Sequence, residues 1–307
     1  MTAAVFAFAD DADRAGDLAR HCGVPLHRIE SRRFPDGESL VRVTATVPTA
    51  LLYRSLDNPD AKLVELLLAA SALRDGGARR VILIAPYLAY MRQDMAFHPG
   101  EAVSQKVIGG LLAATFDGVV TVDPHLHRVA SLAEAIPGIP AIALSAAPAL
   151  AAAIGAGPSG QDTVLVGPDS ESRPWVEAIA RPLGLEVLVG EKVRKGDRDV
   201  ALDIPGIAAV RGRRAVLVDD LISSGTTLIA CAAMLRNAGA QEIAAFATHC
   251  LACAEDVVRL RNAGIARILA TDSTGHELAR IPLAGILSQA IAAQGWLAPS
   301  VKEDPSA

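Results

Sequence analysis

Short apolar runs alternate along the chain with longer segments of helical periodicity. The run at residues 215–218 contains no polar residue, which is typical of a strand buried on both faces of a parallel sheet. Further apolar runs predict strands at residues 5–9, 81–85, 118–122, 164–167, 187–189, 243–248 and 268–271. Strands that alternate with helices form βαβ units, so the pattern predicts an α/β fold with helices flanking a mostly parallel sheet.

Two predicted helix-to-strand corners have nearly the same sequence. Residues 73–78 read Leu-Arg-Asp-Gly-Gly-Ala, and residues 235–240 read Leu-Arg-Asn-Ala-Gly-Ala. Each corner has glycine in the C-cap region of a helix and is followed by an apolar strand. This internal repeat predicts two similar domains.

A chain of 307 residues is long enough for two ordinary domains with full cores. We place the domains at residues 1–142 and 143–283, with the crossover in the span 137–160, which is rich in Ala, Pro and Gly. Residues 284–307 are expected to form a C-terminal helix, packed back on the first domain, and a frayed tail.

Composition and charge narrow the class of protein. Aromatic residues make up only 4% of the chain, so its core is built from Ala, Val, Leu and Ile, which favours helices on a parallel sheet. The net charge of −5 offers no broad basic face, so binding to nucleic acid is not expected. The N-terminus lacks the pattern of a signal peptide, and the Ala-rich stretch 141–156 is interrupted and too short to span a bilayer. We therefore expect a cytoplasmic protein without a membrane partner.

Polar residues follow the strand at 215–218 without a break. Asp219 and Asp220 are expected at the carboxyl end of the strand, where open α/β sheets bind ligands. A small, hydroxyl-rich turn then leads into a helix and supplies Ser223, Ser224, Gly225, Thr226 and Thr227. Backbone N–H groups and hydroxyls that converge at a helix N-terminus form an anion site, which fits the 5-phosphate of a sugar.

The carboxylates of Asp219 and Asp220 can accept hydrogen bonds from ribose hydroxyls or hold a metal-bound diphosphate. A nucleotide P-loop would need a Gly-Lys-Ser/Thr ending, which is missing here. The plainer alternative is an ordinary strand, turn and N-cap. Two adjacent carboxylates directly after a buried strand are costly unless they are used, so we favour a site for a phosphorylated sugar.

This segment resembles the phosphoribosyl pyrophosphate motif of the type I phosphoribosyltransferase superfamily. Other segments narrow the resemblance to the ribose-phosphate pyrophosphokinase family, the phosphoribosyl diphosphate synthetases. Residues 33–38 are similar to the family's Phe-x-Asp-Gly-Glu loop, and residues 86–94 resemble its long and specific Pro-Tyr-x-x-Tyr-x-Arg-Gln-Asp string. The family's metal-coordinating His is matched by His125 in Asp-Pro-His, and its Pro-Asp segment by Pro168 and Asp169.

The resemblance implies two phosphoribosyltransferase-like domains, each a mostly parallel sheet flanked by helices. It implies transfer of the diphosphoryl group of ATP to the C1 hydroxyl of ribose 5-phosphate, giving 5-phosphoribosyl 1-diphosphate and AMP for nucleotide biosynthesis. Mg²⁺ is the implied cofactor, ATP and ribose 5-phosphate are the implied partners, and a homo-oligomer, a dimer or higher, is the implied assembly.

The resemblance also assigns roles to single residues. The implied ATP-binding residues are Phe34, Asp36, Glu38, Arg92, Gln93 and Asp94. The implied ribose 5-phosphate site is Asp219, Asp220, Ser223, Ser224, Gly225, Thr226 and Thr227. The implied metal ligands are His125 and Asp169, while Tyr87 and Tyr90 are expected to be structural. In these terms Phe34 offers a stacking face and Arg92 a forked donor to phosphate.

The charged stretch at residues 191–198 follows an apolar strand and resembles the family's catalytic hairpin with its Lys-x-Arg, here Lys192 and Arg194. Residues two apart on an extended segment point to the same side, so both cations can reach one triphosphate. The alternative is a solvated surface hairpin, which such charge runs usually are. With the resemblance, we expect Lys192 and Arg194 to be the catalytic cations.

Three departures from the family pattern suggest a divergent member. Residues 170–175 replace a Gly-rich turn and add side chains, Glu171 among them, where the backbone normally approaches phosphate. Residues 126–130 lack the Gln-Gly-Phe-Phe pattern, and Met95 stands where a basic residue is common. These departures leave the regulation and substrate preference of the chain open.

Two other functions stay open. One is an enzyme of the phosphoribosyltransferase type that consumes phosphoribosyl diphosphate, against which the two ATP-type segments at residues 34–38 and 92–94 argue. The other is a non-catalytic protein that binds true synthetases and tunes them. Such a protein tends to have a degraded catalytic loop, whereas Lys192, Arg194 and His125 are present here.

The cysteines fit a reducing compartment and stand at positions 22, 231, 250 and 253. Cys250 and Cys253 follow His249, which invites a zinc reading, but a structural zinc needs four ligands and no second pair is present. We expect these two thiols to pack at a junction between a strand and a helix. His127 and His276 are expected to be unligated.

Overall fold

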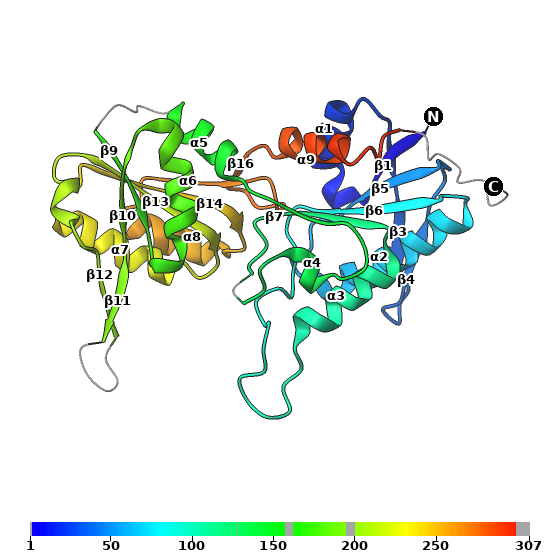
Figure 1. Ribbon diagram of the computed structural model, residues 1–307, viewed down its shortest axis with the longest axis horizontal. Coiled ribbons are helices and arrows are strands. Elements are labelled where there is room, and N and C mark those ends of the chain that lie inside the picture. Colours follow the sequence, from blue (N-terminus) through cyan, green and yellow to red (C-terminus); the bar gives the residue numbers. More distant parts are fainter. Residues whose placement is uncertain (1, 127, 157–161, 195–199, 299–307) are drawn as a thin grey trace. The chain divides into compact units, whose positions relative to one another are not determined.

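The computed structural model describes residues 2–126, 128–156, 162–194 and 200–298, and the side chains of residues 192–201 are outside this description. The chain divides into two compact units (Figure 1). Unit 1 comprises Met1–Leu144 and Leu283–Ala307, and unit 2 comprises Ser145–Pro282. Each unit contains a parallel six-stranded sheet with helices packed on it, which confirms the predicted fold class.

In unit 1 the strand order is β2-β1-β5-β6-β7-β8, and all neighbours are parallel. The strands are β1 (Ala3–Ala7), β2 (Leu26–Arg28), β5 (Thr49–Tyr53), β6 (Arg80–Ala85), β7 (Gly118–Val122) and β8 (Ala141–Leu144). The helices are η1 (Ala9–Asp11), α1 (Ala12–Cys22), α2 (Pro59–Asp75), α3 (Ser104–Thr115), α4 (Leu132–Ala135) and α9 (Ala284–Ala293). The C-terminal helix α9 packs against α1.

In unit 2 the strand order is β10-β9-β13-β14-β15-β16, again with parallel neighbours. The strands are β9 (Thr163–Gly167), β10 (Glu186–Val189), β13 (Arg214–Ile222), β14 (Glu242–Cys250), β15 (Arg267–Thr271) and β16 (Ala279–Ile281). The helices are α5 (Ala147–Gly155), η2 (Ser170–Ser172), α6 (Arg173–Ala180), η3 (Arg181–Leu183), η4 (Ile207–Val210), α7 (Thr226–Asn237) and α8 (Ala254–Asn262).

The two units share one topology. In each, the second strand along the chain lies at the sheet edge and is followed by an antiparallel hairpin. The hairpins are β3 (Glu30–Arg33) with β4 (Ser39–Arg42) in unit 1, and β11 (Glu191–Arg194) with β12 (Val200–Asp203) in unit 2. The expected ATP-binding loop at residues 34–38 and the expected catalytic loop therefore occupy equivalent places in the two units.

The repeated helix-to-strand corners make the same hydrogen bonds. The Ala78 amide donates to the Leu73 carbonyl across 3.0 Å, and the Ala240 amide donates to the Leu235 carbonyl across 3.0 Å. Between them stand Gly77 with φ 98° and Gly239 with φ 90°, a backbone conformation that favours glycine. The sequence repeat thus reflects a repeated structure.

Every apolar run that predicted a strand forms one, because residues on both faces of each sheet are covered and consecutive apolar positions are needed. The prediction missed the central strand β5, although Ala50–Tyr53 is also an uninterrupted apolar run, and it missed the shorter strands β2, β8 and β16. It also ended β13 too early. That strand continues through Asp219 and Asp220 to Ile222, paired with β14.

The core of each unit lies between its sheet and helices and is built mainly from Leu, Ile, Val and Ala. The division between the units falls between Leu144 and Ser145. Among the described residues, no helix is both long and apolar enough to cross a membrane.

Candidate functional site

Asp219 and Asp220 lie in the last part of β13, on opposite faces of the sheet because successive strand residues alternate. The Asp220 amide donates to Asp219 Oδ1 across 3.0 Å. Burial raises the pKa of the Asp219 carboxyl well above its ordinary value, and the charges of Asp220 and Asp169 raise it further. A cation or a hydroxyl donor bound beside Asp219 would stabilise the charged form of this carboxyl.

The loop after β13 leads directly into α7. Gly225 is the N-cap residue of this helix with φ 69°, and a Cβ atom on it would lie 2.7 Å from Leu260 Cδ2. Both conformation and packing therefore require glycine here. No side chain caps the helix, so its first N–H groups are available to an anion. The exposed hydroxyls of Ser224 and Thr226 lie 3.1 Å apart beside them.

Asp169 follows β9 and caps the short helix η2. Its Oδ1 atom accepts hydrogen bonds from the amides of Glu171 at 3.2 Å and Ser172 at 3.3 Å. The Ser172 hydroxyl donates to the Asp169 carbonyl across 2.6 Å and sits over Gly167, where a Cβ atom would be only 2.2 Å from it. The residues that replace the family's Gly-rich turn therefore form a closed turn, with Glu171 exposed to solvent.

A buried polar cluster at the carboxyl ends of β14 and β15 was not predicted. The Ser273 hydroxyl donates to the Thr248 carbonyl across 3.0 Å, so it accepts from His249, whose Nδ1 atom lies 2.8 Å away. This places a proton on His249 Nδ1. His249 pairs in register with Leu221, two residues beyond Asp219 on β13. The sequence showed His249 only as a neighbour of Cys250 and Cys253, so its buried partner Ser273 was not expected.

The hairpin expected to be catalytic forms in unit 2 and extends away from the sheet (Figure 1). Lys192 pairs with Leu202 and Arg194 pairs with Val200, so the two cations occupy alternate positions of β11. Residues two apart on a strand share a face. The side chains of Lys192 and Arg194 and the hairpin tip at 195–199 lie outside the described part of the chain.

The Phe34 loop closes the hairpin of unit 1. The Phe34 amide donates to the Glu38 carbonyl across 2.8 Å, and the Glu38 amide donates to Asp36 Oδ1 across 3.2 Å. These bonds bring the three predicted residues together in one exposed turn. The Arg32 guanidinium lies over the Phe34 ring, 4.7 Å from its centroid, and Phe34 is 36% exposed.

The other predicted ATP-binding residues lie between β6 and α3. Arg92 is exposed, whereas the Gln93 side chain accepts a hydrogen bond from the Ser104 hydroxyl at 3.3 Å. Asp94 forms an ion pair with Arg128 at 2.7 Å. Of this string, Arg92 is thus the residue most accessible to a ligand.

At the equivalent strand end in unit 1, after β5, a buried cation replaces the carboxylates of β13. Arg54 is 4% exposed and pairs with Asp10, with Asp11 at 3.0 Å and with Glu65 at 2.5 Å. Its guanidinium also lies 4.4 Å from the Phe8 ring centroid. Burial raises the pKa of Asp11, although the charges of Arg14 and Arg54 oppose this shift. This end of unit 1 is therefore filled by its own side chains.

The predicted metal ligands belong to different units, His125 to unit 1 and Asp169 to unit 2. Within the described ranges, no three His, Cys, Asp or Glu side chains converge as a metal site. The described residues therefore offer no closed protein cage. Mg²⁺ typically uses one or two carboxylates together with substrate phosphates. The enclosed charges around Asp219, which raise its pKa, fit a cation held in that way.

Cys250 ends β14 and Cys253 is the N-cap residue of α8, which confirms the predicted strand-helix junction. Burial raises the pKa of the Cys250 thiol. The Cys253 thiol lies 3.0 Å from Asp256 Oδ2 within a capping box. His276 is also structural, since its Nδ1 accepts from the Leu278 amide at 3.0 Å while Nε2 lies 2.9 Å from the Ala252 carbonyl.

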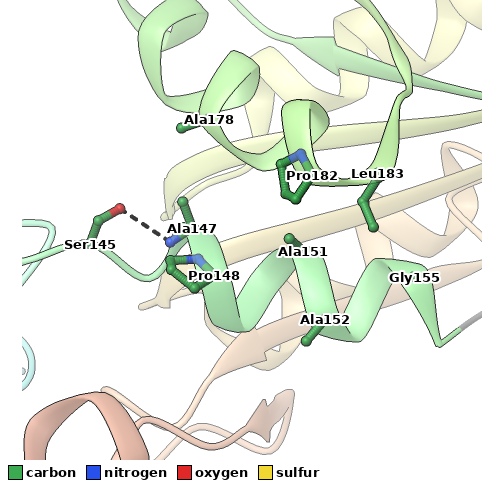
Figure 2. A pocket seen from close by; sticks show the side chains of 9 residues that line it. All are labelled: Ser145, Ala147, Pro148, Ala151, Ala152, Gly155, Ala178, Pro182 and Leu183. Carbon is green, nitrogen blue, oxygen red and sulfur yellow. Dashed lines mark hydrogen bonds between the residues drawn. The ribbon is translucent and has the colours of Figure 1, made fainter. Parts of the chain in front are cut away.

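An apolar cavity of about 770 Å³ lies between α5 and the α6–η3 segment of unit 2 (Figure 2). It is lined by Ser145, Ala147, Pro148, Ala151, Ala152, Gly155, Ala178, Pro182 and Leu183. The Ser145 hydroxyl oxygen already accepts a hydrogen bond from the Ala147 amide at 3.2 Å. The lining carries no charged side chain, so the cavity does not suit a phosphorylated sugar.

Comparison with known proteins agrees with this arrangement of segments. The family model for the N-terminal domain of ribose phosphate pyrophosphokinase matches residues 3–115, and the phosphoribosyl transferase domain model matches residues 134–275. The ribose-phosphate pyrophosphokinase of Methanopyrus kandleri is 34% identical over 276 residues, which are 89% of this chain and 93% of the relative. Ribose-phosphate pyrophosphokinase 2 of Archaeoglobus fulgidus is 32% identical, with 89% and 94% covered.

The crystal structure of phosphoribosylpyrophosphate synthetase from Mycobacterium smegmatis is also similar. It aligns with a TM-score of 0.81 and 26% identity, covering 96% of this chain and 99% of that one. The similarity to the sequence relatives and to this solved structure thus covers both units. The chain belongs to the ribose-phosphate pyrophosphokinase family.

Proposed function

We infer that this protein transfers the diphosphoryl group of ATP to the C1 hydroxyl of ribose 5-phosphate, giving 5-phosphoribosyl 1-diphosphate and AMP. The observation that carries this conclusion is the 34% identity to a ribose-phosphate pyrophosphokinase over 93% of its length, because it includes both the ATP-type segments and the sugar-phosphate loop. A phosphoribosyltransferase that consumes 5-phosphoribosyl 1-diphosphate would not need the ATP-type segments.

For ribose 5-phosphate, we propose that the first N–H groups of α7 and the hydroxyls of Ser223, Ser224, Thr226 and Thr227 bind the 5-phosphate. Gly225 lets the loop turn closely into the helix. Asp219 and Asp220 accept hydrogen bonds from the ribose hydroxyls, which supplies donors to a carboxylate whose burial disfavours its charge. This arrangement would leave the C1 hydroxyl directed away from the helix.

For ATP, we propose that the exposed ring of Phe34 stacks on adenine and that Asp36 and Glu38 accept hydrogen bonds from the nucleoside. Their shared turn supports this role, because it holds the ring and both carboxylates together. Arg92 binds phosphate oxygens through its forked donors, and Gln93 supports the loop that presents it.

In the reaction, the C1 oxygen attacks the β-phosphorus of ATP and the bond from this phosphorus to the α,β-bridging oxygen breaks. The C1 hydroxyl loses its proton, and AMP leaves with the bridging oxygen. Lys192 and Arg194 stabilise the negative charge that develops on the phosphate oxygens. Mg²⁺, when bound, would neutralise phosphate charge, with His125 and Asp169 as its proposed protein ligands.

We also propose that the protein works in the cytoplasm as a homo-oligomer, a dimer or higher. Exposed apolar side chains on α2, Val64 at 50% and Leu68 at 39%, support an assembly that covers this helix. Analytical ultracentrifugation at several protein concentrations would measure the assembly. A monomer at all concentrations would contradict it.

The function is tested by AMP release from ATP and Mg²⁺ with and without ribose 5-phosphate, on wild type, Lys192→Ala and Lys106→Ala. Lys106 is an exposed lysine of α3 without a proposed role, so its variant controls for loss of a surface charge. We expect release that depends on ribose 5-phosphate and falls by about a thousandfold in Lys192→Ala only. Absence of release from well-folded wild type would contradict the proposed function.

A further inference from the structure

The segment that carries Arg92 is strained at its start. Tyr90 has φ 64°, a left-handed conformation that is unfavourable for a bulky residue. Its hydroxyl donates a hydrogen bond to the Asp60 carboxylate on α2, which ties the strained residue to a helix. Such a conformation persists only where the surroundings hold it, so this segment is fixed by its contacts.

The start of α3 holds the backbone on both sides of Arg92. Gln105 is 2% exposed, and its Nε2 atom donates to the Met91 carbonyl across 3.1 Å. The Gln105 amide donates to the Gln93 carbonyl across 3.2 Å. These two bonds leave Arg92 itself as the exposed residue of a braced turn.

Asp94 completes the bracing from another direction. Its Oδ1 accepts from the Arg128 guanidinium at 2.7 Å, and its Oδ2 accepts from the Arg128 backbone amide at 3.1 Å. The Asp94 side chain has no exposed surface, whereas that of Arg128 is 53% exposed. Desolvation acts to raise the pKa of Asp94, but the hydrogen bonds and charge of Arg128 outweigh it and lower the pKa. Both carboxylate oxygens are thus engaged within the protein.

Arg128 lies three residues after His125, on the segment that leaves β7. This segment begins with Asp123, whose φ of 37° is also in the left-handed region. Leu126 packs against the core of unit 1 on the way to Arg128. The pair between Asp94 and Arg128 therefore joins the segment that presents Arg92 to the one that presents His125, and both segments belong to unit 1.

We propose that Asp94 and Arg128 are positioning residues, which act as a clamp that fixes Arg92 and His125 relative to each other. Asp94 then supports the nucleotide site from behind, in place of the direct contact with ATP that the sequence suggested. The proposal rests on the proposed function in one respect, since Arg92 and His125 are taken to meet MgATP. The clamp itself is a property of unit 1 alone.

The test is a double-mutant cycle with Asp94→Ala, Arg128→Ala and the double variant. We expect each single variant to raise KM for MgATP about tenfold, with a smaller change in kcat, because a loosened site loses mainly binding. If the two residues act only through each other, KM for MgATP in the double variant is no higher than in the more impaired single variant. Arg128→Lys, which keeps the charge without the fork, should fall between wild type and Arg128→Ala.

Arg74→Ala is the matched control. Arg74 pairs with Asp117 at 3.1 Å just before β7, so it joins two distant segments of unit 1. This pair lies at the amino ends of the strands, whereas Asp94 and Arg128 follow their carboxyl ends. We expect its KM for MgATP to stay within twofold of wild type. Independent effects of Asp94→Ala and Arg128→Ala that multiply in the double variant would overturn the clamp. A raised KM for MgATP in Asp94→Ala with wild-type amide exchange at residues 123–126 would instead assign Asp94 a contact with ATP and also overturn it.

Hydrogen exchange separates failure of the clamp from failure of the proposed function. In protein without substrates, Arg128→Ala should speed amide exchange at residues 90–94 and 123–126 severalfold, whereas Arg74→Ala should not. Unchanged exchange at both segments would overturn the clamp even in an active enzyme. Faster exchange in Arg128→Ala than in wild type, together with a wild type that releases no AMP, would support the clamp and contradict only the proposed reaction.

Discussion

His249 Nδ1 and the Ser273 hydroxyl lie 2.8 Å apart, and both side chains are buried at the carboxyl edge of the unit 2 sheet. The Ser273 hydroxyl donates its hydrogen bond to the Thr248 carbonyl. The pair therefore links the ends of β14 and β15 beside the strand that carries Asp219. A histidine that looks isolated along the sequence is therefore a fixed part of this edge.

Removing the Ser273 hydroxyl should destabilise the protein. Ser273→Ala leaves a buried His249 N–H without its acceptor, which costs about 1–3 kcal/mol. Urea unfolding would measure this loss. Ser288→Ala is a control, because the Ser288 hydroxyl bonds only locally to the Gly285 carbonyl on α9, at 2.9 Å. An equal effect of the two substitutions would contradict a special role for the buried pair.

Replacing Asp219 should stabilise the unliganded protein while it impairs ribose 5-phosphate binding. The pKa of Asp219 is raised by burial and neighbouring carboxylates, so its contribution to stability is full below its ordinary pKa of 3.8 and is lost as pH rises through the raised pKa. Asp219→Asn carries no such charge. We expect it to be more stable than wild type by about 1 kcal/mol or more at pH 8.

The measurement is the free energy of unfolding between pH 4 and pH 8 without substrates. The advantage of Asp219→Asn should narrow as pH falls toward 4, because wild-type Asp219 then becomes neutral too. A pH-independent difference, or a less stable variant at pH 8, would show that burial does not penalise this carboxylate.

Gly225 should be the most sensitive position of the sugar-phosphate loop. Gly225→Ala meets both a φ of 69° and Leu260, so we expect a loss of about 2 kcal/mol in stability and a raised KM for ribose 5-phosphate. Gly23→Ala isolates the conformational part, because Gly23 has φ 65° and no atom within 4 Å of the added methyl. Thermal unfolding would measure the loss of stability in both variants, and steady-state kinetics would measure their KM for ribose 5-phosphate. An equal loss of stability in the two variants would argue against a packing constraint at Gly225.

Arg32 should matter for ATP through Phe34. Arg32→Ala removes the guanidinium 4.7 Å from the ring centroid, an interaction of about 0.5–1 kcal/mol at an exposed site. We expect KM for MgATP to rise about two- to fivefold, with KM for ribose 5-phosphate unchanged. Arg33→Ala, on the opposite face of β3, provides the comparison. A larger effect of Arg33→Ala would mean that Arg32 does not support the stacking ring.

The sequence predicted the repeated α/β fold because each buried strand needs consecutive apolar residues and each corner needs glycine. The same signal was present at Ala50–Tyr53 of β5 and was overlooked. Contacts between residues that are distant along the chain could not be predicted from this local signal. Arg128 meets Asp94 only because β7 lies beside β6, and Ser273 meets His249 only because β15 lies beside β14. Such pairs depend on sheet order, which no local pattern specifies.

The central claim is that both terminal phosphoryl groups of ATP move together to C1 of ribose 5-phosphate. Phosphorus NMR of a reaction with MgATP and ribose 5-phosphate tests it directly, since every phosphorus atom can be followed. We predict AMP and a sugar that carries a coupled diphosphate, formed in equal amounts. ADP with a singly phosphorylated C1 position, or free phosphate without a sugar diphosphate, would contradict the claim.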